Sequence, residues 1–291
     1  MKNSIELWGL CKRLGSKMAL DGLTFTMEGG VFGVLGGAGA GKSTLLRALA
    51  TLLPPDGGGA RVCGLPLSKP GAVRALVGYL PEHFGIYGGL RLREAMGYLG
   101  ALSGLDTPTC RARTGQLLGC LGLAAEAETR VHRLDASALR RLGVAQALIH
   151  DPRVLLLDEP YAGLAPEERA RLRTLLTETA IDRLVVFATR RPDDVEAVCT
   201  RVAVLEEGKL RYLGAPQDMV ARAAGKVFLA EVPEGALTVL RRRYRVVSVV
   251  SHGHRCVARF LDPTGAPGIG RADRPGIRDA YLLCLHGGAP A

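Results

Sequence analysis

The stretch that decides the fold of this chain is Gly36-Gly37-Ala38-Gly39-Ala40-Gly41-Lys42-Ser43-Thr44. It fits the pattern G-x-x-x-x-G-K-[ST], in which glycines let successive backbone N–H groups turn inward toward phosphate oxygens. The lysine ammonium of this pattern reaches the β- and γ-phosphates of a nucleotide, and the Ser hydroxyl binds Mg²⁺. We therefore predict that residues 36–44 bind the phosphates of a nucleotide, with Ser43 as a ligand of Mg²⁺.

The flanking sequence supports this interpretation. An apolar strand over residues 31–35 leads into the loop, and a helix-forming run over residues 43–53 follows it. The N-terminus of such a helix adds a favourable dipole and free N–H groups for an anion. The alternative, a glycine-rich turn without a ligand, does not require this strand and this helix.

A second apolar run supplies two acids. Residues 154–157 are all aliphatic, as expected for a parallel strand buried on both faces. The strand is followed by Asp158, which we expect to hold Mg²⁺ through water, and by Glu159, which is positioned to polarise water against the γ-phosphate. Glu159 is therefore the predicted catalytic residue, and a solvated turn is the alternative.

Strand and helix signals alternate along the chain and predict an α/β fold with a mostly parallel sheet and flanking helices. Short antiparallel strands precede the glycine-rich loop, and residues 88–150 form a helical insertion with helices expected at 92–102, 110–123 and 138–149. Further elements are predicted at 167–179 (helix), 184–188 (strand) and 202–213 (hairpin). We place a domain boundary at 222/223, which leaves residues 223–291 as a small α+β appendage.

Composition limits the environment of the chain. The seven cysteines contain no C-x-x-C pair and no signal peptide is evident, which predicts reduced thiols in a cytosolic protein. No uncharged apolar run approaches the roughly 18 residues of a membrane span. We expect that the chain does not cross a membrane by itself.

The net charge of +10 is partly local, because residues 221–291 carry 11 Lys and Arg against five Asp and Glu. The cluster Arg241-Arg242-Arg243-Tyr244-Arg245 is compatible with a contact to nucleic acid or to an anionic membrane. A solvated face is the preferred interpretation, because no RNA- or DNA-binding motif accompanies the cluster. No nucleic-acid partner is expected.

Taken together, the glycine-rich loop, the run Leu155-Leu156-Leu157-Asp158-Glu159-Pro160 and residues 140–166 resemble the ATP-binding subunit of an ABC transporter. The resemblance covers about residues 4–220. It implies a P-loop NTPase core, ATP and Mg²⁺ as ligands, and two such chains that pair head to tail around two ATP molecules. It also implies an integral membrane permease as partner and a position at the inner face of the cell membrane. Length and appendage suggest the subgroup that serves ABC-2-type exporters.

Several positions depart from the family pattern. The signature loop aligns with Leu134-Asp135-Ala136-Ser137-Ala138, so that Asp135 places a carboxylate where a hydroxyl is usual. Glu82 replaces a glutamine that links Mg²⁺ to the permease contact, and Arg190 replaces the switch histidine. Ala165 replaces an acid that couples the two ATP sites, and Leu14 replaces the adenine-stacking aromatic.

Two of these departures are candidates for a direct contact. In the family both positions approach the γ-phosphate, so Glu82 and Arg190 would lie close together and could pair as opposite charges. Glu82 could still bind Mg²⁺, and Arg190 could contact a γ-phosphate as a fixed cation, because arginine does not lose its proton at neutral pH. Independent loss of both family residues is the alternative.

Two functions from different classes follow. The first is an ATP-driven transport subunit that works with a permease and with a second ATP-binding chain, its activity attenuated by the altered motifs. The second is an ATP-binding regulatory or scaffold subunit with little or no hydrolysis. A family protein acting on DNA or ribosomes is disfavoured, because the chain has neither a long coiled coil nor a tandem second ATPase.

Overall fold

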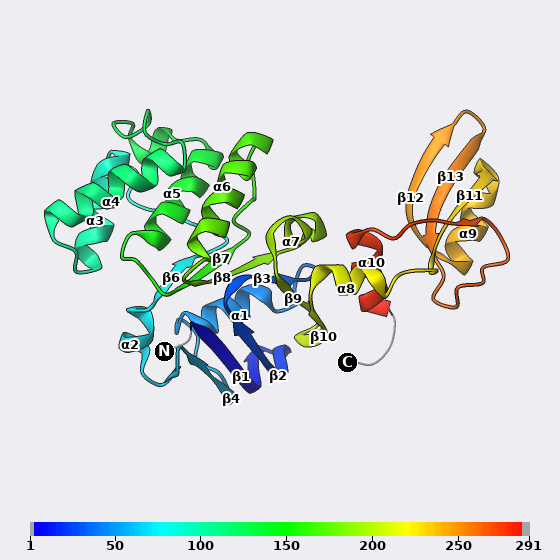
Figure 1. Cartoon of the computed structure of the whole chain (residues 1–291), viewed down its shortest axis with the longest axis horizontal. Helices are drawn as coiled ribbons and strands as arrows, with labels where there is room; N and C mark the ends of the chain where they lie inside the picture. Colours follow the sequence, from blue (N-terminus) through cyan, green and yellow to red (C-terminus); the bar gives the residue numbers. More distant parts are fainter. Residues whose placement is uncertain (1–2, 287–291) are drawn as a thin grey trace. The chain divides into compact units, whose positions relative to one another are not determined.

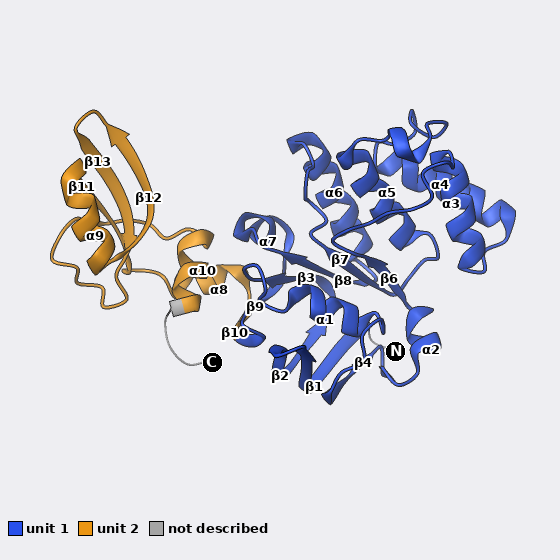
Figure 2. Cartoon of the chain, turned by 180° about the vertical axis from the view of Figure 1, so that it is seen from behind, with its two compact units in different colours: residues 1–210 blue, residues 211–291 orange. Residues whose placement is uncertain are grey.

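The protein is described by a computed structural model that covers residues 3–286 of the 291-residue chain. Two compact units divide it, residues 1–210 and residues 211–291 (Figure 2). This division lies earlier than the boundary expected at 222/223, because helix α8 (Pro216–Ala221) packs against α10 (Ile277–His286) and so belongs to the second unit. The last five residues of the expected appendage lie outside the described residues.

A six-stranded sheet in the order β10-β9-β3-β8-β7-β6 forms the centre of the first unit, and the division at residue 210 falls within its edge strand β10. The neighbours from β9 to β6 run parallel, which confirms the predicted sheet type. Every residue of β7 and β8 is buried, as the uninterrupted apolar runs predict. The strands are β3 (Gly30–Leu35), β6 (Val77–Leu80), β7 (Val154–Asp158), β8 (Leu184–Thr189), β9 (Arg201–Glu206) and β10 (Lys209–Gly214).

A second sheet of the first unit is antiparallel, in the order β2-β1-β4-β5. Its strands are β1 (Ser4–Leu14), β2 (Lys17–Glu28), β4 (Gly57–Val62) and β5 (Leu65–Pro66). Helix α1 (Lys42–Leu49) lies between the two sheets and contacts β2, β7 and β8 (Figure 1). It ends before the predicted residue 53, because Thr51 has the left-handed backbone angle φ of 58° and two prolines follow at 54 and 55.

The helical insertion consists of α3 (Leu92–Leu102), α4 (Thr107–Cys120) and α5 (Ala136–Leu148), which pack against one another at one end of the unit (Figure 1). These helices confirm the three predicted ones, with shifts of a few residues at their ends. The α5 helix also packs on β6 and β7, which joins the insertion to the central sheet. The remaining helices of the unit are α2 (Pro70–Arg74), α6 (Pro166–Thr179) and α7 (Pro192–Val198), with a 3₁₀ turn at Val131–Arg133.

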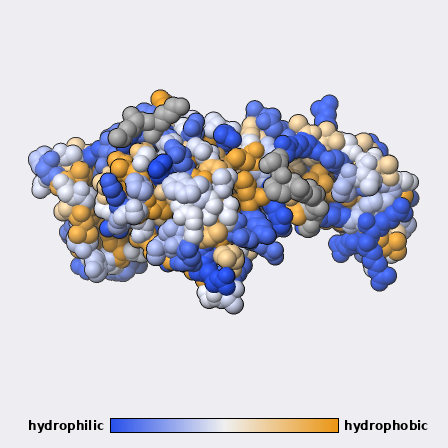
Figure 3. Space-filling view, turned by 90° about the horizontal axis from the view of Figure 1, so that it is seen from below, coloured by the Kyte–Doolittle hydropathy of each residue, from blue (hydrophilic) through white to orange (hydrophobic). Residues whose placement is uncertain are grey.

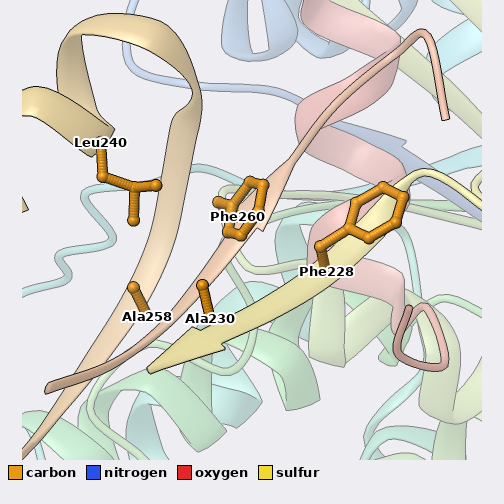
Figure 4. Close-up of a cluster of buried hydrophobic side chains, with 5 residues drawn as sticks. All are labelled: Phe228, Ala230, Leu240, Ala258 and Phe260. Carbon is orange, nitrogen blue, oxygen red and sulfur yellow. The ribbon is translucent and has the colours of Figure 1, made fainter. Parts of the chain in front are cut away.

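The second unit is α+β, as predicted. Its antiparallel sheet has the order β12-β13-β11-β14, and α9 (Leu237–Arg243) packs on β12. Figure 4 shows the core of this unit, where Leu240 of α9 faces Phe228, Phe260 and two alanines of the sheet. The strands are β11 (Val227–Pro233), β12 (Arg245–His252), β13 (Arg255–Leu261) and β14 (Arg271–Ala272), with a 3₁₀ turn at Glu234–Ala236.

Hydrophilic and hydrophobic residues are interspersed over the face of the molecule that Figure 3 shows. Among residues 3–286, no helix is both long enough and apolar enough to span a bilayer.

Candidate nucleotide-binding site

The predicted site residues gather at the carboxyl edge of the central sheet. Leu35 of β3 pairs with Thr189 of β8, and Asp158 of β7 pairs with Ala188 of β8. The residues that follow these three strands therefore meet at one edge, as is usual for ligand sites of open parallel sheets. The glycine-rich loop, the two acids and residue 190 are brought together although they are far apart in the sequence.

The loop between β3 and α1 requires glycine at its last position. Gly41 precedes the helix with φ of 101°, a conformation that L side chains rarely adopt. A Cβ atom at this position would lie 2.3 Å from the carbonyl oxygen of Ala19 on β2. The close approach of β2 thus leaves no room for a side chain at Gly41, whereas the tip of the loop, Gly37, Ala38 and Gly39, is exposed to solvent.

Lys42 lies inside the loop and is only 5% exposed to solvent. Its Nζ donates hydrogen bonds to the carbonyl oxygens of Gly36 (2.8 Å) and Gly37 (2.9 Å). Burial lowers the pKa of the ammonium, while the nearby Glu159 carboxylate opposes that shift. The result is a preformed positive charge at the base of an exposed glycine loop, next to the acids of the site.

Asp158 is the buried acid of the pair, at 1% exposure. Burial raises the pKa of its carboxyl group, and a hydrogen bond from the Ser43 hydroxyl opposes this shift. Its Oδ1 is buried and has no hydrogen-bond partner among the described residues. A buried acceptor without a partner is costly, so this oxygen fits a cation or a water held by a cation.

Ser43 and Asp158 therefore fit the predicted magnesium site. Mg²⁺ usually keeps several waters and is bound by one or two carboxylates together with substrate phosphates. The described residues contain no group of three or more His, Cys, Asp and Glu side chains arranged for a metal ion. A magnesium site here would rest on one hydroxyl, one carboxylate and the nucleotide.

Glu159 has an unusual backbone that aims its side chain into the site. Its φ is +49°, which is uncommon outside glycine and often marks functional positions. Its N–H donates to the carbonyl of Ala188 at 2.9 Å, which ties the residue to the end of β8. Burial raises the pKa of its carboxyl group, whereas the charges of Lys42 and Arg190 lower it.

The structure places Glu82 and Arg190 in direct contact. Arg190 Nη2 donates to Glu82 Oε1 at 2.5 Å, and Arg190 Nε lies 3.3 Å from Glu159 Oε1. One guanidinium therefore bridges the acid after β6 and the predicted catalytic acid after β7. The sequence hypothesis of a Glu82–Arg190 pair matches this geometry, and the second partner, Glu159, was not foreseen.

Sequence reasoning missed Arg140, in the first turns of α5. Its guanidinium donates to three backbone carbonyls, those of Pro81 (3.0 Å), Glu82 (2.5 Å) and Asp158 (3.3 Å). It thereby ties the helical insertion to both segments that carry site acids. Backbone carbonyls as partners leave no pattern in the sequence, so no signal could have identified this residue.

The signature segment forms its own internal contacts. Asp135 caps α5, because its Oδ1 accepts a hydrogen bond from the N–H of Ala138 at 2.6 Å. The hydroxyl of Ser137, in the same segment, donates a hydrogen bond to Glu168 Oε2 at 2.6 Å. Leu14, at the position of the adenine-stacking aromatic, is 43% exposed.

Fold and site together define an α/β protein with a P-loop nucleotide site. Residues 20–162 match the protein family described as ABC transporter. The Nod factor export ATP-binding protein I of Rhizobium sp. (strain N33) is 34% identical over 303 residues and aligned over 98% of both chains. The protein of the same name from Paraburkholderia xenovorans is 37% identical over 228 residues, 76% of this chain and 74% of its own length. This chain belongs to the ATP-binding proteins of ABC transporters.

Solved structures agree with this assignment. An ATP-binding subunit of an ABC transporter superposes with a TM-score of 0.69 at 23% identity, covering 75% of this chain and 92% of that one. CbiO1 from Clostridium perfringens, part of the ABC transporter complex cbiONQ, gives 0.66 at 25% identity, with 76% and 92% covered. The chain is the ATP-binding subunit of an ABC transporter, and it acts as an ATPase that energises transport.

Proposed function

We propose that this chain binds Mg·ATP through residues 36–44 and Asp158 and uses Glu159 for hydrolysis, driving an integral membrane permease. The observation that carries the proposal is the convergence of Lys42, Asp158 and Glu159 at one sheet edge, next to an exposed glycine loop. A buried Asp158 oxygen without a partner supports the magnesium assignment.

Each residue has a defined part in the proposed reaction. The loop N–H groups and the Lys42 ammonium bind and orient the β- and γ-phosphates. Ser43 and Asp158 would hold Mg²⁺, which when bound would neutralise charge on the phosphate oxygens. Glu159 accepts a hydrogen bond from the attacking water and orients it toward the γ-phosphate. Arg190, already beside Glu159, is a fixed cation for the charge that develops there.

The partners of the chain are also proposed. We assign ATP binding to residues 1–222 and leave residues 223–291 as an appendage outside the ATP site. A second ATP-binding chain, identical or different, completes two ATP sites, and the permease holds the pair at the inner face of the cell membrane. Relatives named for Nod factor export support an ABC-2-type exporter rather than an importer.

A second candidate is an ATP-binding regulatory subunit with little hydrolysis. Its support is the altered motif set: Asp135 caps α5 with its own carboxylate, and Arg190 is engaged by two acids. A carboxylate near a triphosphate is repulsive, and more so where water is excluded. The relatives lend no support to attenuated hydrolysis, so the transport ATPase is the better-supported function.

The deciding experiment measures Mg²⁺-dependent ATP turnover and ATP affinity for wild type, Glu159→Gln and Lys42→Ala. We expect Glu159→Gln to keep ATP affinity and to lose turnover at least tenfold, and Lys42→Ala to lose affinity. Equal background turnover in wild type and Glu159→Gln, with ATP bound by both, would favour the regulatory candidate. Undiminished ATP affinity of Lys42→Ala would refute the nucleotide site itself.

A further inference from the structure

The second unit contains a cavity with an arginine rim that the ATP site does not use. Helix α9 ends with Arg241, Arg242 and Arg243, and β12 begins with Arg245. These residues line a cavity of about 630 Å³, which is within the usual size of small-molecule sites. Its other walls come from the end of β13 and the following loop, and from α10: Leu261, Asp262, Pro263, Thr264, Ala266, Leu282 and Leu283.

The positive charge of this rim is not compensated. Among residues 3–286, none of the four arginine side chains forms an ion pair, and all four are exposed. Asp262, the acid in the cavity wall, is buried and accepts hydrogen bonds from the N–H and the hydroxyl of Thr264. Four exposed cations within five residues create a local potential that attracts anions.

The frame of the rim is anchored to the core of the unit. Leu240, next to the first arginine, is buried against the sheet (Figure 4). The ring centroids of Tyr244 and Phe260 lie 4.8 Å apart, and the Tyr244 hydroxyl donates a hydrogen bond to the carbonyl oxygen of Pro267. The backbone that carries the arginines is therefore fixed on both sides, and the Arg243 guanidinium lies over the Tyr244 ring at 5.3 Å from its centroid.

The lining combines two kinds of surface. Guanidinium groups bind phosphate oxygens in a bidentate manner, while Leu261, Leu282 and Leu283 offer apolar contact behind the rim. A free phosphate would use the arginines alone, whereas a phospholipid would use both surfaces.

We propose that this arginine-rimmed cavity binds the phosphate headgroups of anionic phospholipids and gives the chain a direct contact with the membrane surface. The contact does not depend on the ATP site. Each basic residue near an anionic bilayer contributes about 1 kcal/mol of attraction. The four arginines would therefore bind the membrane weakly and reversibly, in addition to any binding of the chain to a permease.

The test uses the full chain and two vesicle types, pure phosphatidylcholine and phosphatidylcholine with phosphatidylglycerol, in a co-sedimentation assay. We expect binding to the anionic vesicles only, decreasing with salt. Arg241→Gln/Arg242→Gln should weaken that binding roughly 30-fold, from about 1 kcal/mol per arginine. The matched control, Arg271→Gln/Arg274→Gln, removes the same charge from exposed positions outside the cavity and should change binding less than threefold.

Unchanged far-ultraviolet circular dichroism and thermal unfolding of both double variants show that the second unit, which carries all four substituted arginines, still folds. Equal binding to the two vesicle types, or an equal loss in the two double variants, overturns the proposal, because either result means that no particular surface recognises the headgroup. A DNA duplex bound as tightly as the anionic vesicles reassigns the rim to nucleic acid. Displacement from vesicles by inorganic phosphate at constant ionic strength reassigns it to a soluble phosphate ligand.

Discussion

The position most constrained by the fold of the nucleotide loop is Gly41, and Gly41→Ala tests that constraint. The added methyl group meets the carbonyl oxygen of Ala19 at 2.3 Å, and φ of 101° is unfavourable for alanine. A left-handed backbone costs about 1–2 kcal/mol, and overpacking against a backbone that cannot rotate away costs about 1–3 kcal/mol. We therefore expect the free energy of unfolding to fall by about 2–5 kcal/mol.

The assay is urea unfolding followed by the fluorescence of Trp8, the single tryptophan. Trp8 lies on β1, which pairs with the strand that carries Ala19, so its signal reports the part of the fold under strain. Gly37→Ala is the matched control in the same loop, since its Cβ would meet no atom within 4 Å and its φ is not positive. Replacing glycine at a compatible position stabilises by about 0.4–1 kcal/mol through the unfolded chain.

Equal unfolding free energies for Gly41→Ala and Gly37→Ala would refute this reasoning. Such a result would mean that the loop relaxes around the methyl group, and that the close approach of β2 does not fix the loop.

Three further outcomes follow from the site. Arg140→Met should lower the unfolding free energy by about 1.5–3 kcal/mol, the value of a hydrogen bond to a charged group, because Arg140 donates to three backbone carbonyls. The same variant should reduce ATP turnover, and unchanged turnover would mean that Arg140 does not position the acids of the site. A double-mutant cycle of Glu82→Gln and Arg190→Gln in urea unfolding should give a coupling of about 0.2–1 kcal/mol, since both side chains are partly exposed, and zero coupling contradicts the pair. Turnover should be lost as pH falls through the raised pKa of Glu159, because the water-polarising carboxylate must be ionised. If ATP turnover instead falls only at or below the ordinary pKa of a glutamate, the water-polarising group is not Glu159 with its raised pKa.

The same raised pKa has a consequence for stability. Because burial disfavours the ionised form of Glu159, the folded chain binds this proton more tightly than the unfolded chain does. The resulting stabilisation is present at low pH and is lost as pH rises through the raised pKa. The acid that hydrolysis requires in its ionised form is thus one that lowers stability near neutral pH.

Much of the fold could be predicted because it follows from local patterns. The uninterrupted aliphatic run at residues 154–157 predicts a strand buried on both faces, and the structure has such a strand, β7, at Val154–Asp158. The helix predicted at 92–102 has those bounds. The compact units divide at residue 210, ahead of the predicted boundary at 222/223, since α8 packs against α10, a contact between segments about 60 residues apart that leaves no pattern in the sequence.

By itself, the sequence determined the nucleotide loop, the two acids after a buried strand and the class of fold, because each depends on short spacings that fix backbone geometry. Only the tertiary structure decided that Arg190 lies between Glu82 and Glu159, that Arg140 holds three carbonyls, and that the arginine cluster borders a cavity. The physical reason is distance along the chain. Charges and carbonyls separated by tens of residues meet only when sheet order and helix packing bring their strand ends together.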